Sequence, residues 1–130
     1  MDIRKVYEID APADDVWAAL TDPEVIVRWG GGPVVMSAEP GFAFSFWGGD
    51  IHGTVLEVDP PRSMTQEWYG GDWPAPSLAV FTLTALPDGG TRLELDHTGV
   101  PDDEGRDFDA GWDDYYLGPL KVLLEDVPGS

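Results

Sequence analysis

The feature that most constrains the fold is an amphipathic stretch near the end of the chain, residues 107–126. If this stretch is helical, its apolar side chains recur at steps of three and four residues and form one wide stripe. The members of the stripe are Phe108, Trp112, Tyr115, Tyr116, Leu120, Leu123 and Leu124. A helix over residues 109–126 is about 27 Å long, roughly the width of a small domain. We therefore expect the rest of the chain to form a sheet around it.

Gly118 and Pro119 interrupt this stripe. A proline inside a helix removes a backbone hydrogen bond and crowds the preceding turn, so we expect a kink here. The kink would separate a ligand-facing first half from a second half that only packs in the core. The tyrosines of the first half need hydrogen-bond partners, or a cavity that contains water or a ligand. Ordinary burial in the core is the alternative for each of them.

Upstream of this stretch, the pattern predicts one strand, two short helices and then a series of strands. The first strand covers residues 3–9, and each helix opens with a proline beside acidic residues, at Pro12 and at Pro23. Alternating apolar and polar side chains predict further strands at residues 34–36, 42–46, 51–58, 63–69, 77–86 and 91–98. Hairpin-length connections make the sheet antiparallel, with about six to seven strands, and the fold class is α+β.

The composition excludes several functional classes. Seven Lys and Arg face 25 Asp and Glu, a formal net charge of -18, which argues against nucleic acids and anionic membrane surfaces as partners. The absence of cysteine excludes disulfides, thiolate catalysis and thiolate metal sites. The chain shows no secretion signal and no apolar run of the ~18 residues that a membrane span needs. We expect a cytoplasmic protein with one domain over residues 1–130, either a monomer or a homodimer.

The order of elements is that of the helix-grip fold, in which a curved antiparallel sheet wraps a long C-terminal helix. Residues 11–24, followed by Trp29 and Gly30, resemble the start of START-like ligand-binding domains of the Bet v 1-like superfamily. Within that superfamily the chain most resembles proteins similar to the C-terminal domain of the activator of the heat-shock protein 90 ATPase. The segments that carry this resemblance are residues 46–49, 53–61, Trp68, 91–101 and 110–116, so that it covers nearly the whole chain.

The resemblance implies a deep cavity between sheet and helix, which holds hydrophobic molecules in many members of the superfamily. It also implies a possible stress-response role as a co-chaperone of a heat-shock protein 90 type chaperone. That activity belongs to longer eukaryotic proteins with an additional N-terminal domain. Small-molecule binding and chaperone contact are therefore both hypotheses for this chain.

Inward strand faces and the helix stripe supply the side chains that we expect to line the cavity. They are Trp29, Phe44, Phe46, Trp47, Met64, Gln66, Trp68, Phe81, His97, Trp112, Tyr115 and Tyr116. A domain of this size does not need so many indoles to fill a core, and wide apolar walls favour a hydrophobic or aromatic small molecule. Core packing remains the alternative for each aromatic residue taken singly.

His97 is the polar residue of greatest interest, because it shares a strand face with Leu93 and Leu95. It either binds a ligand or water in the cavity, or is satisfied by a tyrosine hydroxyl or a backbone carbonyl. A third hypothesis is a cyclase, dehydratase or hydrolase that uses His97 with a tyrosine. No catalytic motif is present, so we assign no catalytic residue and expect no cofactor. The two histidines lack metal-ligand spacing, and no metal site is expected.

Overall fold

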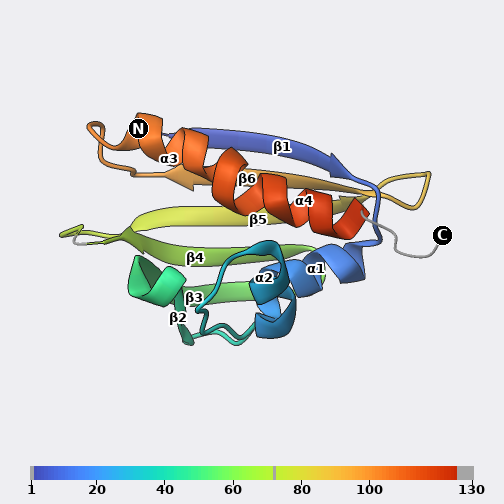
Figure 1. Cartoon of the computed structure of the whole chain (residues 1–130), viewed down its shortest axis with the longest axis horizontal. Helices are drawn as coiled ribbons and strands as arrows, with labels where there is room; N and C mark the ends of the chain where they lie inside the picture. The colour runs from blue at the N-terminus through green and yellow to red at the C-terminus, as the bar shows by residue number, and fades with distance from the viewer. Residues whose placement is uncertain (1, 72, 126–130) are drawn as a thin grey trace.

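The computed structural model describes residues 2–71 and 73–125, and it confirms the α+β helix-grip fold (Figure 1). A curved antiparallel sheet of six strands has the order β1-β6-β5-β4-β3-β2. A long helical stretch near the C-terminus crosses one face of this sheet. The strands are β1 (Ile3–Ile9), β2 (Ala43–Phe46), β3 (Ile51–Asp59), β4 (Ser63–Gly70), β5 (Ser77–Ala85) and β6 (Thr91–Thr98).

Two short helices follow β1, as predicted, and the C-terminal helical stretch has three segments. The helices are α1 (Ala13–Thr21), α2 (Pro23–Trp29), the 3-10 turn η1 (Trp47–Gly49), α3 (Gly105–Gly111), the π-helical turn η2 (Trp112–Leu117) and α4 (Gly118–Glu125). Within the described ranges, no helix has the length and apolar character needed to cross a membrane. The predicted end of the last helix, residue 126, lies outside the described residues.

The predicted strand at residues 34–36 is wrong. Only Val35 pairs there, in an isolated bridge with Ser45 at the outer side of β2. Pro33 precedes it and has no backbone N–H, so the segment cannot start a regular ladder. The chain instead runs along the edge of the sheet as an irregular segment.

The boundary between α1 and α2 follows from local chemistry. Asp22 ends the first helix in an extended conformation, and its carboxylate accepts a hydrogen bond from the Glu24 backbone N–H at 2.9 Å. Pro23 then occupies the start of α2, where no backbone donor is needed. Gly30 adopts a left-handed φ of 105° and ends α2, a conformation that favours glycine. These signals place two short helices beside α4.

The core lies between the concave face of the sheet and the C-terminal helical stretch. Leu93, Leu95 and His97 alternate inward along β6 and are almost completely buried, as the alternation predicted. A bulge between Val55 and Glu57 shifts the register of β3 against β4, and such bulges bend a strand. The bend helps the sheet to curve around the helical stretch.

The helical stretch accommodates Pro119 through the π turn at η2. The backbone N–H of Gly118 donates to the carbonyl of Asp113, five residues earlier. A Cβ atom on Gly118 would lie 2.1 Å from that carbonyl oxygen, far inside van der Waals contact. The irregularity predicted from Gly118 and Pro119 is therefore a widened turn just before the proline, and glycine is required at its end.

We expect Gly118→Ala to lower the free energy of unfolding by about 1–3 kcal/mol, because the added methyl group collides with the Asp113 carbonyl. This sign is unusual, since alanine normally stabilises a helix by about 1 kcal/mol relative to glycine. Gly111→Ala is the matched control, because its Cβ would meet nothing closer than 4.0 Å. Urea unfolding of both variants checks the prediction. Equal stability of the two variants would contradict it.

Candidate functional site

The candidate site is a pocket of about 350 Å³ between the first half of the C-terminal helical stretch and the start of β3. It opens to solvent, and its exposed walls are almost entirely apolar. The residues that line it are Trp47, Asp50, Ile51, Trp68, Asp107, Phe108, Gly111, Trp112, Tyr115 and Tyr116. A volume of this size lies near the lower end of the range for small-molecule sites.

Several of the side chains predicted to line a cavity lie in this pocket. They are Trp47, Trp68, Trp112, Tyr115 and Tyr116. Trp68, Trp112 and Tyr116 are buried and form its inner wall, while Tyr115 is 68% exposed and stands at its mouth. The π turn explains this division, because Trp112 and Tyr116 face the sheet while Tyr115 points outward.

The remaining predicted residues do not line the pocket. They are Trp29, Phe44, Phe46, Met64, Gln66, Phe81 and His97, and all of them are buried. Their side chains belong to the buried core between the sheet and the helical stretch. Phe46 and Phe81 stack on the Tyr116 ring at centroid distances of 5.4 Å and 6.1 Å. The pocket involves only part of the predicted set, beside the first half of the helical stretch.

Five lining residues were not predicted. They are Asp50, Ile51, Asp107, Phe108 and Gly111. Phe108 belongs to the apolar stripe of the helix, so the periodicity contained a signal for it. Asp50 and Ile51 follow a turn, and only the packing of that turn against the helix brings them to the pocket.

His97 is the centre of a buried hydrogen-bond chain beneath the pocket. The indole N–H of Trp112 donates to Nδ1 of His97 at 3.0 Å, so Nδ1 must carry the lone pair. The proton of the neutral ring is then on Nε2, which lies 2.7 Å from the Ser77 hydroxyl. That hydroxyl donates in turn to the backbone carbonyl of Trp68 at 2.6 Å. Every donor in the chain has an acceptor, and the tautomer follows from the direction of the bonds.

Burial lowers the pKa of His97 from 6.5 to about 4. The ring is therefore neutral at physiological pH, in agreement with its role as acceptor for Trp112. Of the two interpretations of His97 from the sequence, the structure supports a histidine satisfied by protein partners. The partners are a tryptophan and a serine rather than a tyrosine or a carbonyl.

Tyr116 differs from His97, because its hydroxyl has no hydrogen-bond partner within residues 2–71 and 73–125. The side chain is only 2% exposed. Over the same residues, no buried side-chain nitrogen or oxygen that is shielded from solvent lacks a partner. The Tyr116 hydroxyl is therefore not fully shielded from solvent, and Tyr116 is one of the residues that line the pocket. Burial raises the pKa of Tyr116, so the hydroxyl keeps its proton and remains available as a donor.

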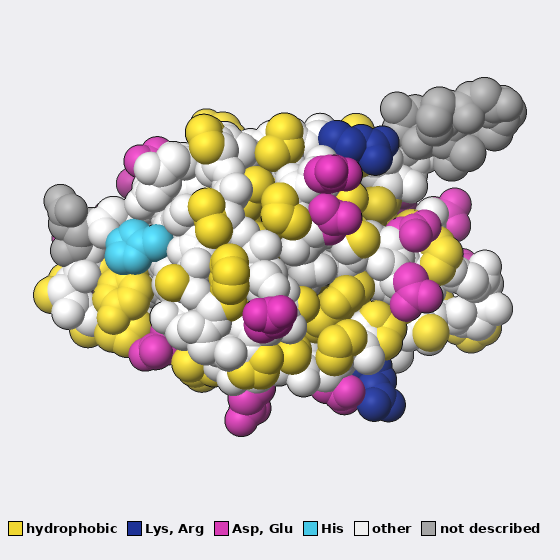
Figure 2. All heavy atoms as spheres, turned by 90° about the horizontal axis from the view of Figure 1, so that it is seen from below, with side chains coloured by type: hydrophobic (Ala, Val, Ile, Leu, Met, Phe, Trp, Pro, Cys, Tyr) yellow, Lys and Arg dark blue, Asp and Glu magenta, His cyan; other side chains and the backbone are white. Residues whose placement is uncertain are grey.

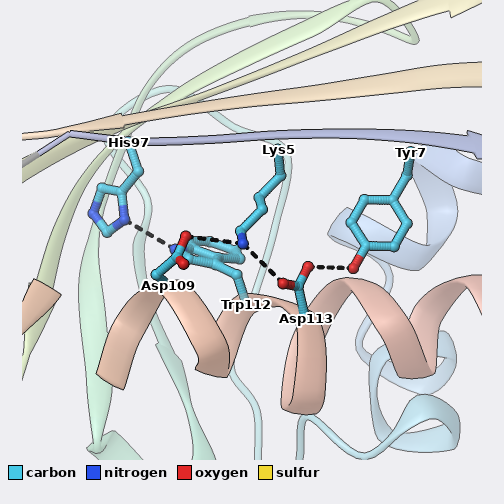
Figure 3. A network of polar contacts seen from close by, with 6 residues as sticks. All are labelled: Lys5, Tyr7, His97, Asp109, Trp112 and Asp113. Atoms are coloured by element: carbon cyan, nitrogen blue, oxygen red, sulfur yellow. Dashed lines mark hydrogen bonds and ion pairs between the residues drawn. The ribbon is translucent and has the colours of Figure 1, made fainter. Parts of the chain in front are cut away.

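A second polar network holds the helical stretch against β1 (Figure 3). Lys5 reaches from β1 to Asp109 at 2.9 Å and to Asp113 at 2.8 Å, one helical turn apart. The hydroxyl of Tyr7, also on β1, donates to Asp113. These contacts and the Trp112–His97 bond attach the same helical segment to two adjacent strands, β1 and β6.

The contacts within this network change the pKa values of Asp113 and Tyr7. Burial alone would raise the pKa of Asp113, but hydrogen bonds from Lys5 and Tyr7 and the charge of Lys5 lower it overall. Burial and the hydrogen bond to Asp113 together raise the pKa of Tyr7. At neutral pH Lys5 and Asp113 therefore form an ion pair, and the Tyr7 phenol keeps its proton. None of these side chains lines the pocket, so we assign the network to positioning the helix.

Comparison with known proteins matches residues 10–125 to the family described as activator of Hsp90 ATPase homolog 1-like protein. Activator of 90 kDa heat shock protein ATPase homolog 2 of Mus musculus is 28% identical over 89% of this chain and 35% of the mouse protein. This chain spans about a third of the length of the curated relatives that it matches first.

Two solved structures are similar over most of the chain. An HSP90 activator from Plasmodium falciparum has a TM-score of 0.87 and 22% identity, and the match covers 95% of this chain and 96% of that one. CalU16 from Micromonospora echinospora has a TM-score of 0.81 and 31% identity, and the match covers 96% of this chain and 76% of that one. The first likeness shows a shared fold, and the second also shows sequence similarity.

We expect His97 to make stability depend on pH. Between about pH 6.5 and 4 the unfolded chain binds a proton at this ring and the folded chain does not, so stability falls as the pH falls. The wild type should lose about 2–3 kcal/mol from this group between pH 7.5 and 4.5. His97→Gln does not lose this contribution, so the difference in unfolding free energy between the two proteins should narrow by that amount. Urea unfolding at both pH values measures it.

Comparing the two proteins cancels the titration of the carboxylates, which is common to both. Nitrogen-15 NMR of the wild type at pH 6 provides a test that needs no variant, and it should show a neutral ring with the proton on Nε2. A charged His97 ring at that pH would contradict the prediction.

Proposed function

The chain belongs to the family of activator of Hsp90 ATPase homolog 1-like proteins, and we propose that its pocket binds a small, mostly apolar organic molecule. One observation carries this proposal: the Tyr116 hydroxyl is an unpartnered polar group on a buried side chain that borders an apolar pocket. A polar group in such surroundings gains free energy from a hydrogen-bond partner. A ligand with one polar atom at its inner end would supply that partner.

The walls of the pocket favour a flat ring system. The rings of Trp68 and Trp112 stack with centroids 5.2 Å apart and an interplanar angle of 27°. The rings of Trp112 and Tyr116 also contact each other, with centroids 4.7 Å apart. These rings support one another and the ring positions are held by the His97 bond, so the wall is preformed. A pocket of about 350 Å³ suits a compact ligand of roughly one to three rings.

The geometry favours binding without turnover. A general base needs a free lone pair within reach of the ligand. Both ring nitrogens of His97 are occupied, by Trp112 and by Ser77, and the ring lies outside the pocket lining. The hypothesis of an enzyme that uses His97 and a tyrosine therefore has less support than ligand binding.

We expect Tyr116→Phe to weaken ligand binding about ten-fold and to leave the unfolding free energy within about 0.5 kcal/mol of wild type. The reason is that the hydroxyl binds no protein group, so its removal breaks no internal hydrogen bond. A thermal-shift screen of aromatic compounds identifies ligands. Calorimetric titration of the best ligand into wild type and into the Tyr116→Phe variant then measures the change in affinity.

Tyr115→Phe is the matched control, because Tyr115 lies at the mouth and is mostly exposed. This variant should change the affinity by less than about two-fold. If no compound in a broad aromatic screen binds, or if Tyr116→Phe binds as tightly as wild type, the proposed role of Tyr116 is wrong.

Contact with a heat-shock protein 90 type chaperone is the second candidate function. It is favoured by the match of the family model to residues 10–125 and by the names of relatives such as the mouse homolog. Calorimetry of this chain against a purified chaperone of that type, together with an assay of its ATPase rate, tests the candidate. If the chain neither binds the chaperone nor stimulates its ATPase at high micromolar concentration, this candidate function is excluded. Both measurements are repeated with a pocket ligand present, so that any effect of the ligand on chaperone binding or on the ATPase rate is detected.

A further inference from the structure

We propose that the ligand of this pocket is a cation, a small organic amine with an aromatic body, whose ammonium group lies at the pocket mouth. This inference rests on the proposed ligand-binding function and specifies the chemical class of the ligand. It is carried by the charges around the mouth, the aromatic walls and the unpartnered Tyr116 hydroxyl. Each is an independent property of the same pocket.

The charges at the pocket are of one sign. Two lining residues, Asp50 and Asp107, are exposed acids, and no lining residue is Lys or Arg. Within the described part of the chain, neither carboxylate forms an ion pair. The two acids come from different elements, the turn before β3 and helix α3, and both border the pocket, whose exposed walls are otherwise almost entirely apolar.

The pocket lining contains no basic side chain, and the basic residue beside it in sequence is Arg106, which precedes Asp107 in α3. Lys5 is bound by Asp109 and Asp113, and Lys121 by Glu125. On the face shown in Figure 2, Asp and Glu are spread across the surface, while Lys and Arg occur in its right-hand half. With a formal net charge of -18, the surface attracts cations to the mouth and repels anions.

The walls are suited to a cation with an aromatic body. Indole and phenol rings attract an ammonium group through their negative faces, and tryptophan is the strongest of these rings. Among the lining aromatic residues, Tyr115 is exposed and Trp47 is half-buried, and the indole N–H of Trp47 donates to the Gly30 carbonyl at 2.7 Å. The ring body would lie deeper, against Trp68 and Trp112, and a polar atom on its inner edge would be the partner of the Tyr116 hydroxyl.

Negatively charged and neutral ligands fit this pocket less well than a cationic ligand. A carboxylate ligand would place a third negative charge beside Asp50 and Asp107 with no cation to offset it. A neutral ligand would fill the aromatic wall but gain nothing from the two acids. The expected order of affinity is therefore amine, then neutral analogue, then acid.

Three compounds with the same ring system test this order by isothermal titration calorimetry of the whole chain: 2-naphthylmethylamine, 2-naphthylmethanol and 2-naphthoic acid. We expect the amine to bind about ten-fold more tightly than the alcohol, and the acid to bind most weakly. Raising the salt concentration from 20 to 500 mM should reduce the preference for the amine, because exposed charges are screened, and should leave the alcohol unchanged.

A charge-neutral variant tests the two acids directly. Asp50→Asn combined with Asp107→Asn should reduce the affinity for the amine about ten-fold and leave that for the alcohol unchanged. Asp14→Asn combined with Asp15→Asn is the matched control, because it removes the same charge from α1, outside the pocket lining. The control should change the affinity for the amine by less than about two-fold.

The outcomes separate this inference from the function on which it rests. Equal affinity for the amine and the alcohol, or an unchanged affinity of the Asp50 and Asp107 variant for the amine, would overturn the inference while the pocket remains a binding site. No binding of any of the three compounds up to 1 mM would overturn the proposed function as well, provided that the aromatic screen also finds no ligand.

Discussion

The structure depends on the hydrogen bond between Trp112 and His97, which joins the C-terminal helical stretch to β6, the strand next to the edge strand β1. A buried indole and a buried imidazole each need a partner, and here each satisfies the other. The other ring nitrogen of His97, Nε2, donates to the Ser77 hydroxyl on β5. That hydroxyl donates to the backbone carbonyl of Trp68 on β4. These consecutive hydrogen bonds fix the position of Trp112, and with it the helical stretch, over the adjacent strands β6, β5 and β4.

This attachment explains why the two sides of the helical stretch differ. On the side of β1, Lys5 and Tyr7 bind the acidic side chains of the helix. On the side of β3, no such contacts exist among the described residues, and the aromatic pocket opens there. The π turn contributes to this difference, because it places Trp112 and Tyr116 inward while Tyr115 remains exposed.

The candidate site could be predicted only in part. The stripe on the helix and the inward face of β4 predicted Trp68, Trp112 and Tyr116 for the site, and these three residues line the pocket. Phe44, Phe81 and Met64 have the same inward orientation and the same apolar character, yet they pack solidly. Periodicity states which face a side chain occupies, but not whether the opposite wall is near enough to touch it. That distance depends on the summed volumes of many side chains.

The sequence by itself determined the elements, their order and the face that each side chain occupies, because backbone periodicity and turn chemistry are local properties. It also determined the acidity of the surface, which needs only a count of residues. Only the tertiary structure decided that His97 is satisfied and that the Tyr116 hydroxyl is not. Hydrogen-bond partners come from residues far apart in the chain, and their distances are set by packing. The long amphipathic stretch predicted a sheet around a helix, and the side chains in between decided how much space remained.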